Sequence, residues 1–157
     1  MLNRKLLKVN LTTQSYEVED IPISLRKKYF GGRGLNMAYL YHLVSPDTKP
    51  FDKGNPVILG CGLLNGIYFG RMNISGKSPE SGLLGDSNIG GYFPSELARC
   101  GISHVIIIGK SKEPVYLLIN NDKVEFKNAK HLWGMDTYET QTSIRSELNA
   151  DDVKVIC

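Results

Sequence analysis

Two short glycine-rich segments hold the residues of this 157-residue sequence that are best suited to chemistry. One contains Arg71, which follows a glycine, and the other spans residues 88–91 and ends in Gly90-Gly91. The two glycines precede a predicted helix, where free main-chain N–H groups and the helix dipole attract anions. An arginine can hold a phosphate or a carboxylate through two parallel hydrogen bonds. Asn88 can cap the turn or give its carbonyl oxygen to a cation that bridges phosphates.

These residues predict an anion-binding site when they are taken together. Taken one at a time, each also has a plain structural interpretation. Gly90-Gly91 alone is equally typical of a turn, and Arg71 alone is typical of a solvated charge at the end of a strand.

Two other glycine-rich stretches do not match known nucleotide motifs. The segment 31–34 opens a predicted helix but lacks the G-x-G-x-x-G pattern of dinucleotide-binding folds. The segment 76–78 resembles the end of a phosphate-binding loop, but Arg71 stands where that loop needs a glycine. We therefore exclude a P-loop nucleotide triphosphatase.

The remaining reactive side chains are scattered. The sequence has three histidines and three cysteines, at His42, His104, His131, Cys61, Cys100 and Cys157. Their spacing fits neither a zinc site nor a disulfide framework, so we expect structural or surface histidines and reduced thiols. No serine lies in a G-x-S-x-G motif. Asp86 and Glu80 are the carboxylates nearest the glycine-rich segments, and they are weak support for acid–base catalysis.

The elements that must position these residues alternate between strands and helices without a regular βαβ repeat. Apolar periodicity and turn residues predict strands within residues 4–20 (a hairpin) and at 56–60, 71–75, 82–87, 105–108, 115–119 and 124–126. They predict helices at 24–30, 34–44, 92–100 and 136–148, the first capped by Ser24 and the last by Asp136. Trp133 is expected to lie in the core. This order favours an α+β fold over a doubly wound sheet.

Composition indicates one ordinary globular domain. Lys and Arg number 19 against 16 Asp and Glu, and 41% of the residues are hydrophobic. A net charge of +3 is too small to indicate nucleic acid or an anionic membrane as a partner. The longest apolar run, 105–108, is far shorter than the roughly 20 residues of a membrane span. Since no signal peptide is visible at the N-terminus, we expect a cytoplasmic protein.

The last five residues, Val153 to Cys157, are predicted to form an apolar strand. Domains usually end in frayed polar residues rather than within a core element. We therefore expect that the sequence is a piece of a longer protein.

Several of these segments occur together in one known family. In order along the chain they are Lys8-Val9-Asn10-Leu11-Thr12-Thr13, Phe30-Gly31-Gly32-Arg33-Gly34-Leu35, Gly70-Arg71-Met72-Asn73 with Lys77-Ser78-Pro79, Asn88-Ile89-Gly90-Gly91-Tyr92-Phe93 and His131-Leu132-Trp133-Gly134. This pattern resembles the N-terminal domain of the aldehyde:ferredoxin oxidoreductase family, the tungsten or molybdenum bis-pterin enzymes. The resemblance covers essentially the whole chain.

The resemblance implies that residues 1–157 form a metallopterin-binding N-terminal domain that is incomplete at its C-terminal end. The implied fold has two intertwined β-sheet subdomains with helices, on which the metallopterin sits. Arg71 corresponds to the arginine between the pterin and an iron–sulfur cluster. Asn88, Gly90 and Gly91 correspond to the loop at the pterin phosphates, with the main chain of Asn88 at their bridging magnesium. Ile89 stands where some members have a small polar residue, which a main-chain contact would survive.

The resemblance further implies a cofactor scaffold in a longer oxidoreductase that converts aldehydes to carboxylic acids with a ferredoxin-type electron acceptor. The family's 4Fe-4S ligands lie in later domains, and none of the three cysteines here falls at a ligand position. We expect the isolated chain to be inactive, to need the C-terminal domains of the parent, and to form a homodimer through an unpaired sheet edge. Two alternatives stay open: a stand-alone module for anions or small ligands, or a non-catalytic subunit. The family relationship also leaves open the metal and a substrate other than an aldehyde.

Overall fold

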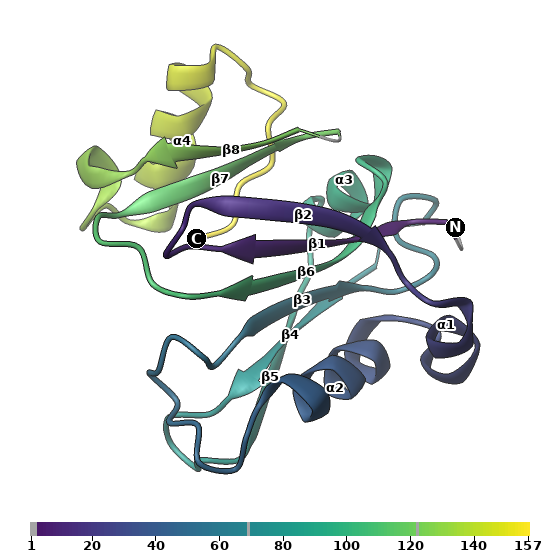
Figure 1. Cartoon of the computed structure of the whole chain (residues 1–157). Helices are drawn as coiled ribbons and strands as arrows, with labels where there is room; N and C mark the ends of the chain where they lie inside the picture. The colour runs from purple at the N-terminus through teal and green to yellow at the C-terminus, as the bar shows by residue number, and fades with distance from the viewer. Residues whose placement is uncertain (1–2, 69, 122) are drawn as a thin grey trace.

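A six-stranded mixed sheet forms the centre of the computed structural model, which describes residues 3–68, 70–121 and 123–157. Its strands are β1 (Lys5–Asn10), β2 (Ser15–Asp20), β3 (Val57–Cys61), β4 (Met72–Lys77), β5 (Leu84–Ile89) and β6 (Ile102–Ile108). They lie in the order β2-β1-β6-β3-β4-β5 (Figure 1). All neighbours are antiparallel except β1 and β6, which run parallel in the middle of the sheet.

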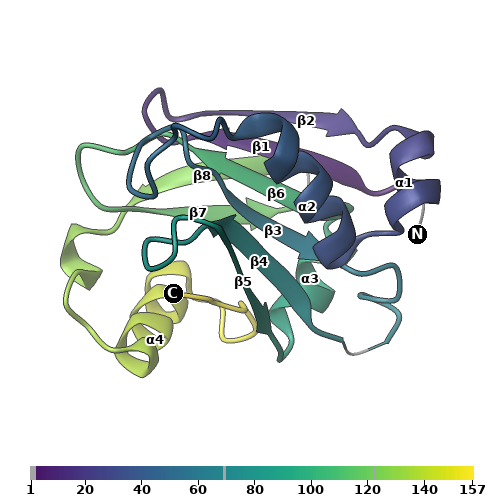
Figure 2. The same cartoon turned by 90° about the horizontal axis from the view of Figure 1, so that it is seen from below.

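Both faces of this sheet are buried, because neighbouring apolar residues point to opposite sides of a strand. Leu6 and Ile106 pack on the face that is covered by α1 (Ile23–Tyr29) and α2 (Gly32–Leu43). Leu7 and Val105 pack on the other face, where α3 (Phe93–Arg99) and a second sheet lie. The two helices α1 and α2 lie along one side of the sheet in Figure 2.

The second sheet is a hairpin of β7 (Val115–Asn120) and β8 (Lys123–Asn128). One of its faces adds Leu117, Ile119, Val124 and Phe126 to the core that it shares with the central sheet. Its other side is covered by α4 (Thr137–Leu148), which packs through Ile144 in a separate small cluster (Figure 1). A short 3₁₀ turn, η1 (Lys130–Leu132), links the hairpin to this helix.

The predicted α+β class with two sheets is confirmed. The hairpin within residues 4–20 is confirmed, and so are the other predicted strands up to residue 126, with ends shifted by up to three residues. Asp136 caps α4 as predicted, with its carboxylate accepting from the main-chain N–H groups of Tyr138 and Glu139. All three cysteines are free.

Three local predictions are wrong. Residues 153–157 form no strand, because the segment makes no ladder of main-chain hydrogen bonds with a neighbour in the described chain. The first helix begins at Ile23, so Ser24 lies inside it and does not cap it. Trp133, expected in the core, is 81% exposed, because it follows η1 on the outside of the hairpin layer.

No helix in the described parts of the chain is long and apolar enough to cross a membrane.

Candidate anion-binding site

The residues singled out in the sequence gather at one end of the central sheet. Strand β3 ends there at Cys61, which pairs with Met72 at the start of β4, and Met72 pairs with Ile89 at the end of β5. Because β4 and β5 are antiparallel, Arg71 and the segment 88–91 lie at the same edge, which is formed by the start of β4 and the end of β5. The chain then continues from that edge into α3.

Arg71 and Gly90 lie side by side at this edge. A Cβ atom on Gly90 would lie 3.9 Å from Cγ of Arg71, and it would meet no other atom within 4 Å. The Arg71 side chain is exposed, and it forms no ion pair with any carboxylate of the described residues. This cation is therefore available to an anion from outside the chain.

Gly91 turns the chain from β5 toward α3. Its φ angle of +79° lies in the left-handed region, which glycine adopts without strain. A Cβ atom here would have no neighbour within 4 Å, so conformation rather than close packing requires glycine at this position. The open space beside the main chain is what a bound anion would need.

The structure corrects the predicted role of Asn88 as a cap. Asn88 and Ile89 are the last two residues of β5, and Asn88 pairs with Asn73 in the sheet. The helix α3 begins only at Phe93, with Tyr92 in the N-cap position and no side-chain cap. Gly90 and Gly91 thus form the connection before the helix rather than its first turn.

Asn73, which belongs to a family motif but was given no role from the sequence, supports this edge from beneath. It is 3% exposed, and its Nδ2 atom donates to the Asp86 carboxylate at 3.0 Å and to the main-chain oxygen of Ser87 at 3.0 Å. Its contact with Oδ1 of Asn88 is 3.5 Å. A buried amide therefore fixes the end of strand β5, on which the candidate site depends.

The network continues beneath the sheet to Asn36, on the buried side of α2. Asn36 is fully buried, and its Nδ2 atom donates to the main-chain oxygens of Ile58 at 3.2 Å and Asn73 at 3.1 Å. It also lies 3.2 Å from Oγ of Ser75, which donates to Asn73. Sequence periodicity gave no signal for these residues, because a buried amide occupies a position where an apolar residue would fit the same pattern.

The loop between β3 and β4 borders the site and is held by a third buried amide, Asn65. Oδ1 of Asn65 accepts from the Gly62 N–H at 2.7 Å, and its Nδ2 atom donates to the Gly70 oxygen at 3.0 Å. Arg4 donates to the main-chain oxygens of Leu63 and Asn65. A glycine-rich loop containing one asparagine is a signal that could have identified Asn65.

The turn at Gly31-Gly32 packs against the same end of β3. A Cβ atom on Gly31 would lie 2.9 Å from the Cys61 oxygen, so only glycine allows this approach. Arg33, in the next position, forms a 2.7 Å ion pair with Asp86 on β5. The pair joins α2 to the strand that carries the candidate site, and it leaves Asp86 neutralised rather than free to repel an anion.

Two buried groups near this end have shifted pKa values. Burial, together with the nearby Arg26 cation, lowers the pKa of His104 to about 4. Burial raises the pKa of the Cys61 thiol to about 12, and the Arg4 cation opposes this. Both groups are uncharged at neutral pH, which supports the predicted structural roles of this histidine and this cysteine.

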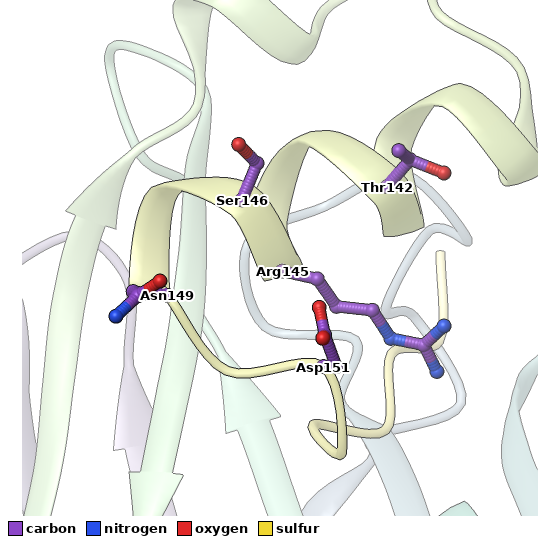
Figure 3. Close-up of a pocket in the computed structure, with 5 residues that line it drawn as sticks. All are labelled: Thr142, Arg145, Ser146, Asn149 and Asp151. Atoms are coloured by element: carbon purple, nitrogen blue, oxygen red, sulfur yellow. The ribbon is translucent and has the colours of Figure 1, made fainter.

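A small polar pocket elsewhere does not resemble a functional site. It lies at the end of α4 and is lined by Thr142, Arg145, Ser146, Asn149 and Asp151 (Figure 3). Nε of Arg145 is used by the chain itself, because it donates to the main-chain oxygen of Val153 at 2.9 Å. No group of three or more histidines, cysteines, aspartates or glutamates among the described residues could hold a metal ion.

Several known proteins are similar to this chain in sequence. Residues 6–157 match the family model described as aldehyde ferredoxin oxidoreductase, N-terminal domain. The chain is 35% identical over 154 residues to the tungsten-containing aldehyde ferredoxin oxidoreductase of Pyrococcus furiosus, and 36% identical to that of Thermococcus kodakarensis. It is 34% identical to a WOR-like subunit of an aliphatic sulfonate oxidoreductase of Pyrococcus furiosus.

A solved structure agrees with this family. The active site complex BamBC of benzoyl coenzyme A reductase, in complex with 1,5-dienoyl-CoA, matches 96% of the chain with a TM-score of 0.91 and 38% identity. The chain covers 23% of that structure's chain. It covers 26% of each of the two tungsten-containing aldehyde ferredoxin oxidoreductases, with 96% of its own residues aligned. It thus spans about a quarter of the length of these relatives.

Proposed function

Because the chain belongs to the aldehyde ferredoxin oxidoreductase family through its N-terminal domain, we propose that it is the cofactor scaffold of a longer tungsten- or molybdenum-pterin oxidoreductase. The parent would oxidise aldehydes to carboxylic acids and pass the electrons to a ferredoxin-type acceptor. The 4Fe-4S cluster and the substrate channel would belong to other parts of that polypeptide.

The single observation that carries this proposal is that Arg71 lies beside Gly90 at the open edge of the sheet. The guanidinium group has no carboxylate partner in the described chain, and the glycine main chain beside it has open space. A phosphate or another anionic group fits such a cradle, because arginine and main-chain N–H groups both donate to anionic oxygens.

Within the parent, the residues of this chain would bind and orient the cofactor. Gly90 and Gly91 would bring main-chain N–H groups to the pterin phosphates, and the Asn88 main chain would face their magnesium ion. Arg71 would lie between the pterin and the cluster, where its positive charge favours the anionic groups of both. The metallopterin, when bound, supplies the two-electron redox chemistry. Asn73 would keep the end of β5 in position without touching the cofactor.

A chimera tests the proposal directly. This chain replaces the matched quarter of the Pyrococcus furiosus relative, and the product is expressed with tungstate or molybdate. We expect a chimera that retains metal and reduces a viologen dye in the presence of an aldehyde. A folded chimera that contains neither tungsten nor molybdenum would contradict the scaffold role.

A second candidate is a scaffold in an oxidoreductase with a different substrate. Two relatives support it, since one is a WOR-like subunit of an aliphatic sulfonate oxidoreductase and the other belongs to the active site complex of a benzoyl coenzyme A reductase. The chimera tests the scaffold role that both candidates share. The substrate must therefore be assayed with the native parent. Turnover of an aldehyde by that parent would favour the first candidate, and turnover of a sulfonate or an aromatic thioester the second.

A further inference from the structure

A large apolar cavity lies between the two sheets and touches the candidate site at Ile89. Its volume is about 1240 Å³, far above the small voids that occur in the interior of a close-packed domain. One wall is the face of the central sheet, including Ile74 and Ile107, and another is formed by α3 through Phe93 and Leu97. Such a space, lined by apolar groups, favours an apolar occupant over water.

The third wall is a strand with an unpaired edge. All six residues of β7 line the cavity, whereas no residue of β8 does, so the cavity lies on the side of β7 away from its partner. In the described chain β7 pairs with β8 alone. Its other edge presents main-chain N–H and C=O groups that an added strand could pair with.

The last residues of the chain run along the same cavity. Val153 to Cys157 line it outside any strand; residues 153–156 are half-buried and Cys157 is exposed. Val155 and Ile156 pack on two different core clusters. Arg145 holds the start of this segment through the Val153 oxygen. A polypeptide that continues from this point therefore starts at the wall of the cavity.

We propose that the cavity is the docking site of an apolar, strand-forming segment from the part of the longer parent polypeptide for which this chain has no counterpart. Three quarters of each aldehyde-oxidising relative lies outside the match, so the parent has ample chain to supply the segment. It pairs with the free edge of β7 and packs its apolar side chains against Ile74 and Ile107. The inference rests on the proposal that this chain is part of a longer oxidoreductase.

Cys100 offers a readout, because it lines the cavity and is partly exposed. The background is the Cys157→Ser variant, in which Cys61 stays silent because it is buried and its pKa is raised to about 12. The rate of maleimide labelling at Cys100 is measured in the 157-residue chain and in the chimera with the Pyrococcus furiosus relative. Labelling of a cysteine introduced by Ser24→Cys, on the exposed side of α1, is the matched control.

We expect labelling of Cys100 to be at least tenfold slower in the chimera than in the isolated chain, with the α1 control unchanged. Equal rates, or a chimera that does not fold cooperatively, would overturn the proposal. A concentration-dependent dimer of the isolated chain with slow labelling at Cys100 would also overturn it, because a second copy would then be the occupant. The assay measures neither cofactor binding nor turnover, so it fails separately from the proposed function.

A second variant tests the open space in the isolated chain itself. Ile74→Trp adds volume on the cavity wall, and we expect it to raise the unfolding midpoint and to slow labelling at Cys100 by several-fold. The matched substitution Ile23→Trp, at an exposed position on α1, should change neither. A lower midpoint for Ile74→Trp, with labelling unchanged, would mean that the isolated chain has already closed the space, and it would overturn the proposal.

Discussion

Asn36 on α2 donates from its Nδ2 atom to the main-chain oxygen of Asn73 on β4, across 3.1 Å and in full burial. This hydrogen bond joins the helix layer to the strand that supports the candidate site. Asn73 in turn holds Asp86, Ser87 and Asn88 on the neighbouring strand β5. A change beneath the sheet should therefore affect the geometry of the glycine turn at its edge.

The first prediction concerns Asn73. Asn73→Ala removes an amide that serves several buried partners, and leaving such partners unsatisfied costs about 1–3 kcal/mol. We expect a loss of about 2–3 kcal/mol in the free energy of unfolding, measured by urea denaturation. Asn120→Ala is the control, because Asn120 is exposed and its side chain accepts a hydrogen bond from exposed Asn121. It should change stability by less than about 0.5 kcal/mol. Equal effects of the two variants would mean that the buried network does not stabilise the sheet.

The second prediction concerns Gly60 on β3. A Cβ atom there would lie 2.2 Å from Oδ1 and 2.8 Å from Cγ of Asn36, which is impossible without movement of a fully buried side chain. Gly60→Ala should cost about 1–3 kcal/mol in the free energy of unfolding. Gly54→Ala, where a Cβ atom would meet nothing within 4 Å, should be close to neutral.

A double-mutant cycle identifies the cause of the Gly60 effect. Asn36→Ala removes the atoms that the new methyl group would meet, so the double variant should cost less than the sum of the single variants by about 1 kcal/mol or more. Additive costs would show that the strain arises elsewhere.

The third prediction is a pH dependence of stability that arises from His104. Its pKa is about 4 in the folded chain and 6.5 in the unfolded chain, so between these values the unfolded state binds the additional proton. Stability should be independent of this group above pH 6.5, should fall as the pH is lowered toward 4, and should level off below. A difference of about 2.5 pKa units corresponds to about 3 kcal/mol.

His104→Gln tests this pH dependence. The variant is expected to be less stable at neutral pH, but the slope of its unfolding free energy between pH 6.5 and 4 should be smaller than that of the wild-type chain. His42→Gln, on the exposed side of α2, should keep the wild-type slope. A wild-type slope in His104→Gln would assign the acid sensitivity to other groups.

The fourth prediction concerns Arg71 in the chimera with the tungsten-containing relative. Arg71→Ala removes the unpaired cation beside Gly90, and we expect a several-fold lower tungsten content per folded protein, with Arg71→Lys intermediate. Arg99→Ala is the control, since Arg99 is also exposed but is paired with Glu96 on α3. Elemental analysis provides the measurement, and unchanged metal content with unchanged turnover in Arg71→Ala would remove the proposed role.

Local rules predicted the parts of the fold that depend on neighbours in sequence. Asp136 and Glu139 form the capping box of α4, an arrangement specified within four residues. The same reasoning failed for Val153 to Cys157, because an apolar run becomes a strand only if a partner strand lies beside it. Local reasoning also placed Asn88 at the start of the helix. In the structure Gly91 lies in the left-handed region and α3 begins only at Phe93. This geometry depends on how β5 leaves the sheet, which the neighbouring residues do not specify.

The candidate site was predictable in its residue types but not in its support. Arg71 and the segment 88–91 are visible as a pattern, and the antiparallel pairing of β4 and β5 explains why they meet. The supporting roles of Asn36, Asn65 and Asn73 were not predicted. Asn36 and Asn73 bond to residues distant in sequence, and the loop that Asn65 holds is fixed by distant Arg4. Buried amides give no periodic signal that separates them from the surface asparagines of loops.

The parallel pairing of β1 with β6 has a consequence for the order in which the chain can fold. Lys5 and Ser103, which are joined at this pairing, are separated by 98 positions in the sequence. The hairpin of β1 and β2 leaves the ribosome before β6, so both faces of β1 stay uncovered until the helices and β6 have been synthesised. Closing so long a loop slows folding, and the apolar residues of β1 remain accessible to chaperones during that interval. Strand β1 is therefore synthesised long before the neighbour that fixes its place at the centre of the sheet.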